Sequence, residues 1–298
     1  MFKIYIKLYG KISKRVWDVN FKMAIKHRNL YRGFISSLII GWRIETNWAS
    51  PINVLFVKTI RPISSAIILS IMYSVASRGS NLEDLLWVII GISTWGLVQS
   101  QVELMYWAIT SEREWLRNIK NIILSPTPFF IYLSARASSG VPFAIFSFFT
   151  ITIVSNIFLN LNITLDSILF FEFTLSLVIG LIILFFLGLL TAGITLNVPR
   201  TPIGVGEAIV GLLYLISGSI IRPEILPSYI QNLSTSLPLI HWIELVRFSI
   251  HPVFRDNPYD WESLLFTSII FSIGCFFSYV FLFKLSRKHG KIDQATMY

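Results

Sequence analysis

The chain has 298 residues, of which 54% are hydrophobic and only 14% are charged, and its mean hydropathy is +0.67. These values exclude an ordinary soluble domain and predict a protein with several membrane-spanning segments. The net charge of +9 is not gathered into one basic domain, which argues against a nucleic-acid partner. The single cysteine, Cys275, excludes a disulfide framework and a cysteine-rich zinc site.

Residues 1–50 are predicted to form a basic cytosolic N-terminus followed by an interfacial helix. Lysines at spacings of three or four share one face of a predicted helix: Lys3, Lys7, Lys11 and Lys14. Either lipid headgroups or water could cover this face. The apolar run 34–44 is too short to cross a bilayer and contains Trp42, so we expect a helix lying in the membrane plane.

Residues 51–284 are predicted to hold six spans, because a hydrocarbon core requires about 20 apolar residues. The predicted spans are residues 51–76, 85–109, 129–158, 167–196, 203–220 and 261–283. Ser50 and Pro51 are suited to the N-cap and first position of the first helix, and Pro142 predicts a kink in the third. The proline-broken stretch 221–260 is predicted to form short re-entrant helices, and residues 285–298 a cytosolic tail. The expected fold is an all-α integral membrane protein.

The distribution of lysine predicts the orientation. All eleven lysines fall at or before Lys120 or at or after Lys284. Because cytosolic loops are enriched in Lys and Arg, both termini and the loops 111–128 and 197–202 are predicted to be cytosolic.

A charged insert, residues 111–128, joins the second and third predicted spans. Glu112 and Glu114 fall in the first turn of a predicted helix, where the helix dipole favours anions, and Pro126 and Pro128 end it. The sequence therefore predicts a short, exposed helix on the membrane surface. This helix is either a plain connection or a docking element for a partner.

Polar side chains also occur inside the predicted spans. Gln99 and Glu103 lie in the last third of the second span, where we expect them to face protein or water. Arg136 lies in the third span at a depth that matches Glu103. We therefore hypothesise that Glu103 and Arg136 form an ion pair, the alternative being that each extends separately to the cytosolic headgroups.

The motifs of common enzymes are absent from the sequence. There is no phosphate-binding G-x-x-x-x-G-K-[ST] loop, no H-E-x-x-H, and no nucleophile motif of the G-x-S-x-G type. The four histidines are scattered along the chain. The sequence thus predicts no catalytic residue, no cofactor and no metal site, and we expect a protein that is not itself an enzyme.

The arrangement resembles the membrane subunits of type-2 ABC exporters, the ABC-2 permeases. In the insert, the resemblance is carried by Glu112-Arg113-Glu114 and Leu124-Ser125-Pro126. In the stretch before the last span, it is carried by Ser217-Gly218, by Arg222-Pro223-Glu224-Ile225-Leu226-Pro227, by Leu237-Pro238-Leu239 and by Glu244-Leu245-Val246-Arg247. The chain departs from the family where Trp115-Leu116-Arg117-Asn118 replaces the usual Gly-Thr-Leu-Glu, and where Leu237-Pro238 replaces an Asn-Pro pair.

The resemblance implies a six-span permease of the plasma membrane that pairs with a second copy or a paralogue. The insert would bind a separate cytosolic ABC ATPase, which would carry ATP and Mg. The expected function is ATP-driven export of an amphiphilic, drug-like or lipid-linked substrate. The alternatives are export of a polysaccharide or glycolipid, and an integral membrane enzyme that acts on lipid.

Overall fold

The computed structural model describes residues 27–47, 50–76, 82–159, 161–198, 202–256, 259–292 and 294, and every regular element in these ranges is helical. The predicted basic stretch 1–26 lies outside them. The longer helices are α2 (His27–Thr46), α3 (Pro51–Ala76), α4 (Leu82–Thr110), α6 (Phe129–Leu159), α7 (Phe170–Asn197), α8 (Pro202–Ile216), α10 (Pro238–Ile250) and α11 (Trp261–Lys288). The shorter ones are η1 (Ser111–Trp115), α5 (Ile119–Leu124), η2 (Leu165–Ser167), η3 (Pro223–Ile225), α9 (Ser228–Thr235) and η4 (Pro252–Phe254).

Within the described ranges, four helices are long and apolar enough to cross a membrane: Glu83–Trp115, Phe129–Leu159, Phe170–Asn197 and Trp261–Lys288. The chain is therefore an all-helical membrane protein. Helix α3 begins and ends where the first span was predicted, whereas α8 has only 15 residues. A count of six spans thus remains a prediction.

The helix starts follow from capping chemistry. The Ser50 side chain accepts a hydrogen bond from the Asn53 N–H at 3.4 Å, and Pro51 is the first residue of α3, which confirms the predicted start. At the other end of the chain, the Asp260 side chain accepts from the Ser263 N–H at 3.1 Å and caps α11. Helix α6 runs through Pro142 without ending.

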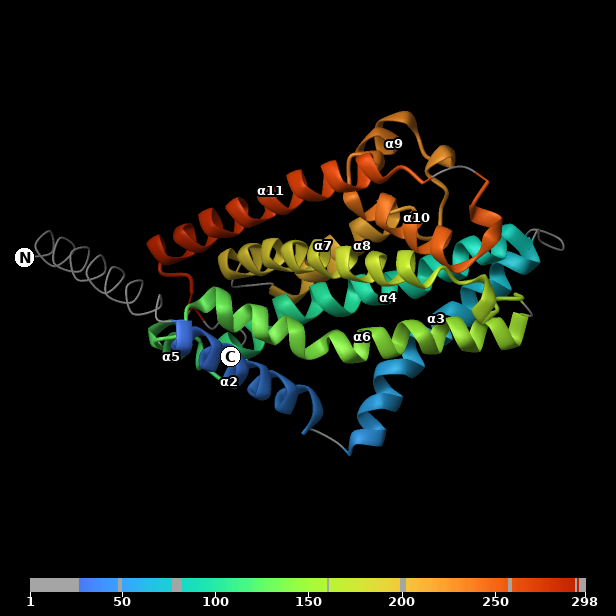
Figure 1. Ribbon diagram of the computed structural model, residues 1–298. Coiled ribbons are helices and arrows are strands. Elements are labelled where there is room, and N and C mark those ends of the chain that lie inside the picture. The colour runs from blue at the N-terminus through green and yellow to red at the C-terminus, as the bar shows by residue number, and fades with distance from the viewer. Residues whose placement is uncertain are drawn as a thin grey trace, which may run out of the picture.

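Helix α4 lies at the centre of the bundle and packs against α3, α6, α7, α8 and α10 (Figure 1). It is the most buried of the four membrane-length helices. Its buried aromatic residues, Trp95 and Tyr106, belong to the main hydrophobic core together with Trp242 of α10. Helix α10 packs on α7 so closely that a Cβ at Gly180 would lie 2.1 Å from the Trp242 ring. Glycine at this position is therefore required by packing.

Helix α2 runs along α6 near the α5 end of the bundle (Figure 1). Its Gly33 faces Thr127, and its Gly41 faces Ser139 of α6. The Trp42 ring stacks on Phe143 with centroids 5.1 Å apart. These contacts fix α2 on the bundle, whereas its orientation in a membrane remains a prediction.

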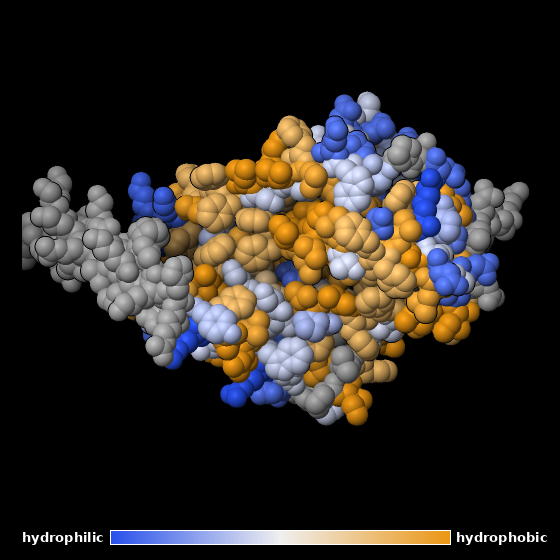
Figure 2. Space-filling view, viewed as in Figure 1, coloured by the Kyte–Doolittle hydropathy of each residue, from blue (hydrophilic) through white to orange (hydrophobic). Residues whose placement is uncertain are grey.

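The opposite end of the bundle carries η3, α9, α10 and η4 (Figure 1). The fifth span was predicted to extend to residue 220, but α8 ends at Ile216. Gly218 follows with a φ of 70°, a left-handed conformation that glycine adopts without strain and that ends a helix. Figure 2 shows apolar side chains over the middle of one face and hydrophilic side chains towards its margins, as expected for a membrane protein.

Candidate functional site

The charged insert consists of a buried turn followed by an exposed tip. Helix α4 continues directly into η1, a wider helical turn in which the Leu116 N–H donates to the Ser111 carbonyl at 2.8 Å. Glu112, Arg113 and Glu114 are each no more than 3% exposed. The prediction that they form an exposed surface helix is therefore wrong.

The buried charges of η1 are held by groups of α6 and α7 and by one ion pair within the turn. The Tyr132 hydroxyl of α6 donates to Glu112 Oε1. Arg113 Nε donates to Glu114 Oε1 at 3.1 Å, and Arg113 Nη1 donates to the Thr195 carbonyl near the end of α7 at 3.2 Å. A buried charge is costly unless it is paired and hydrogen-bonded, so these contacts explain how the turn tolerates burial. They also fasten η1 to both α6 and α7.

Residues 115–118, the exposed tip, follow this anchored turn. Trp115 and Leu116 are each 54% exposed, and Arg117 and Asn118 are exposed as well. Arg117 has a φ of 50°, which turns the chain into α5. The Trp115 ring lies 5.1 Å from the Trp107 ring, so its position is defined by packing. The tip therefore presents two large apolar side chains on a turn whose position is fixed.

The end of α5 contains the remaining predicted residues of the insert. Leu124 is exposed, and the Ser125 hydroxyl donates to the Ile122 carbonyl at 2.7 Å and to the Thr127 carbonyl at 3.2 Å. Ser125 thus closes α5, and Pro126 continues the chain at the surface. Leu124 is the only side chain of the three that offers a large apolar contact.

The structure gives Glu103 and Arg136, the two members of the hypothesised pair, other partners. Glu103 Oε1 accepts a hydrogen bond from Trp107 Nε1, one turn along α4, at 3.3 Å. Arg136 is buried, and its Nη1 donates to the Gly41 carbonyl at 3.3 Å. Arg136 therefore ties α6 to α2, and Gln99 is half-buried on α4.

At the α9 end, Arg247 is 1% exposed and binds backbone carbonyls. Its Nε and Nη2 donate to the Trp87 carbonyl at 3.3 and 3.2 Å, and Nη2 also donates to the carbonyls of Gly218 and Ser219 at 2.9 and 3.0 Å. The guanidinium carbon lies 3.5 Å from the centroid of the Trp87 ring, a cation–π contact. Burial lowers the pKa of Arg247, an effect that the Glu244 carboxylate opposes.

Arg222 joins the same region from the surface. Its Nη2 donates to Glu83 Oε1 at 2.9 Å and to Asp84 Oδ1 at 2.7 Å, and its guanidinium lies 4.9 Å from the Trp87 ring centroid. Sequence reasoning singled out Arg247 and Arg222 but missed Trp87 as the partner of both and Glu83 and Asp84 as the partners of Arg222. The sequence did contain a signal. Glu83 and Asp84 are acidic residues at the start of α4, and Arg222 is a basic residue in a stretch predicted to lie on the same, outer side.

The predicted prolines and acidic residues of this end have separate roles. Pro223 is buried and begins η3, and Pro238 is the first residue of α10. Pro227 and Glu224 are exposed. The prolines therefore set where the short helices begin, which is what a fixed φ and a missing N–H favour.

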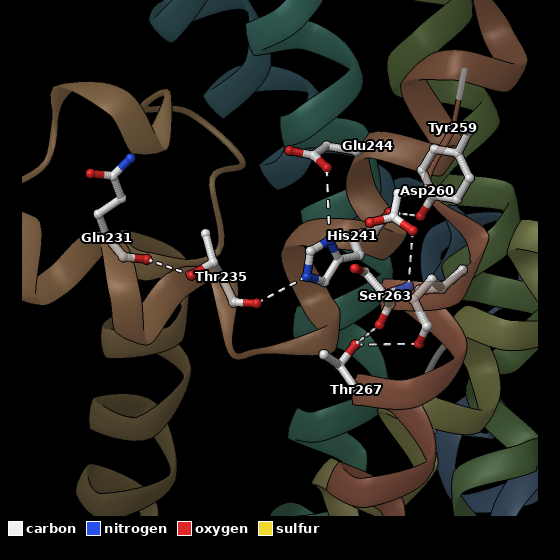
Figure 3. A network of polar contacts seen from close by, with 9 residues as sticks. Gln231, Thr235, His241, Glu244, Tyr259, Asp260, Ser263 and Thr267 are labelled. Carbon is white, nitrogen blue, oxygen red and sulfur yellow. Dashed lines mark hydrogen bonds and ion pairs between the residues drawn. The ribbon is translucent and has the colours of Figure 1, made fainter. Parts of the chain in front are cut away.

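A polar network joins α9, α10 and the start of α11 (Figure 3). His241 Nε2 lies 2.9 Å from the Thr235 carbonyl, which can only accept, so this nitrogen carries a hydrogen. His241 Nδ1 lies 4.0 Å from Glu244 Oε2, and the Tyr259 hydroxyl donates to the His241 carbonyl. Burial raises the pKa of Glu244, and the charges of His241 and Arg247 act in the opposite direction.

Comparison and chemistry assign no known site. Among the described residues, no group of three or more His, Cys, Asp or Glu side chains could hold a metal ion. No protein-family model matches the chain, and a search of curated proteins finds no match.

Proposed function

We propose that this chain is the permease subunit of an ATP-driven exporter of the ABC-2 type, in the plasma membrane. In this proposal α3, α4, α6, α7, α8 and α11 cross the membrane and α2 lies in its plane. Both termini and the α5 end face the cytosol. ATP and Mg are bound by a separate ATPase subunit, and this chain forms the route by which the substrate crosses the membrane.

The observation that carries the proposal is the exposed tip on an anchored turn. A docking element has to present apolar and charged side chains to a partner, and it has to transmit force without bending. Trp115, Leu116 and Arg117 meet the first condition. The buried contacts of Glu112 with Tyr132, and of Arg113 with Thr195, support the second. The docking residues proposed here are therefore those of the tip, and Glu112 and Arg113 act as its anchor.

A second copy of this chain would complete the route of the substrate. Helix α3 exposes large apolar side chains such as Ile52 and Phe56. Helix α8 contains Gly204 and Gly211, where an added Cβ would meet no atom of the described residues within 4 Å. Small residues let two helices approach closely within a bilayer. We propose that α3 and α8 face the second copy. An apolar path between them favours an amphiphilic, drug-like or lipid-linked substrate over a small ion.

The proposal is tested by co-expressing the chain with each ABC ATPase subunit encoded in the same genome. The measurements are co-purification and ATP-dependent uptake of a fluorescent phospholipid into inside-out vesicles. The tip variant Trp115→Ala with Leu116→Ser should weaken ATPase binding roughly ten-fold or more, since apolar anchors dominate interface energies. Leu165→Ser, which changes another exposed leucine in η2, is the matched control.

Failure of every ATPase to bind the wild-type chain would refute the proposal. Binding that survives the tip variant would place the docking surface elsewhere and remove the observation on which the proposal rests. Turnover of a lipid by the chain alone would favour a membrane enzyme instead.

A further inference from the structure

The chain between α8 and η3, residues 217–222, has no regular secondary structure. Its backbone carbonyls therefore need partners from elsewhere, because an unpaired polar group is costly where water is scarce. Arg247 supplies donors to two of them, at Gly218 and Ser219. The close fit extends to α4, where a Cβ at Gly91 would lie 1.8 Å from the Ser219 carbonyl oxygen.

Five side chains form what we call the Trp87 clamp: Glu83, Asp84, Trp87, Arg222 and Arg247. Both guanidinium groups approach the Trp87 ring, at 3.5 Å for Arg247 and 4.9 Å for Arg222. Trp87, Glu83 and Asp84 all lie in the first two turns of α4. The clamp thus fastens the segment that follows α8 to the beginning of α4.

The two arginines of the clamp differ in how easily their contacts with partner groups can break. The side chain of Arg247 is almost wholly buried and makes four hydrogen bonds to three carbonyls. The Arg222 side chain is 35% exposed, and its partners Glu83 and Asp84 are 50% and 30% exposed. Exposed ion pairs contribute little to stability, whereas removing a buried group leaves several polar atoms unsatisfied.

We propose that the Trp87 clamp is a two-part closure in which Arg247 is a fixed pivot and Arg222 is a releasable latch. When the Arg222 bridge opens, residues 220–222 move away from the start of α4, while the carbonyls of Gly218 and Ser219 stay bound to Arg247. The latch is a property of the single chain and goes beyond the proposed function, so it can be tested without an ATPase.

Hydrogen exchange of the purified chain in nanodiscs tests the latch, because exchange reports local opening. Arg222→Gln is expected to speed exchange in residues 220–222 about two- to five-fold, the range expected for loss of an exposed ion pair. Glu83→Gln combined with Asp84→Asn should give the same increase, and the triple variant no more than either. Arg255→Gln is the matched control. Arg255 is an arginine of the same end that donates to the carbonyls of Phe248, Ser167 and Ser249.

The pivot is tested by thermal unfolding. Arg247→Lys keeps the charge but cannot reach all three carbonyls, and it should lower the Tm more than Arg222→Gln does; failure to fold counts as the larger loss. Unchanged exchange in Arg222→Gln would overturn the latch, as would an equal increase in Arg255→Gln. A Tm loss in Arg247→Lys no greater than that in Arg222→Gln would overturn the pivot.

Discussion

The hydrogen bond between Tyr132 and Glu112 offers a sharp test of how η1 is anchored. The Tyr132 side chain is 5% exposed and Glu112 is 3% exposed, and Glu112 Oε2 has no hydrogen-bond partner within the described part of the chain. Tyr132→Phe removes one hydroxyl and leaves the ring packing unchanged. Oε1 of the buried Glu112 carboxylate then loses its donor, so that neither carboxylate oxygen has a hydrogen-bond partner among the described residues.

The size of the effect follows from the charge of the acceptor. A hydrogen bond to a charged group contributes about 1.5–3 kcal/mol, and a buried charged acceptor without a donor costs at least as much. We therefore expect Tyr132→Phe to lower the free energy of unfolding by about 2 kcal/mol. Glu112→Gln reduces the charge that needs a partner, so the double variant should lose less than the sum of the two single variants.

The assay is reversible unfolding in mixed micelles, followed by circular dichroism. Tyr229→Phe is the control, because Tyr229 of α9 is 73% exposed. It should stay within about 0.5 kcal/mol of the wild type. A Tyr132→Phe variant as stable as this control would refute the anchoring role of the bond.

Two further predictions concern orientation and pH. In a Cys275→Ser background, Ser228→Cys should react with an impermeant thiol reagent in intact cells, and Asn121→Cys should react only after permeabilisation; labelling of Asn121→Cys from outside would reverse the proposed orientation. Burial, followed by the charge of Arg255, lowers the pKa of His251, whose Nδ1 accepts from the Val253 N–H at 3.3 Å. A lowered folded-state pKa gives stability that is present above the unfolded value of about 6.5 and is lost as the pH falls towards the folded value. Melting temperatures of the wild type should thus fall more steeply between about pH 7 and pH 5 than those of His251→Gln, and parallel profiles would exclude this role.

The sequence by itself determined the helical class and most of the long helices. The ends of α3 and α6 were predicted closely because Ser50, Pro51 and Pro128 act locally and because long apolar runs have few other folds in a membrane. The fifth helix was predicted too long, since the left-handed turn at Gly218 depends on how residues 217–222 pack. Apolar composition alone does not show where a helix ends and a turn begins.

Only the tertiary structure decided the surroundings of the charged residues. The sequence predicted Glu112 and Arg113 in an exposed helix because their partners, Tyr132 of α6 and the Thr195 carbonyl of α7, come from helices whose packing no local pattern reveals. Likewise, Arg247 and Trp87 are 160 residues apart in the chain. A charge is buried when distant groups satisfy it, and the energy of that satisfaction belongs to the pair, so the sequence around either residue does not contain it.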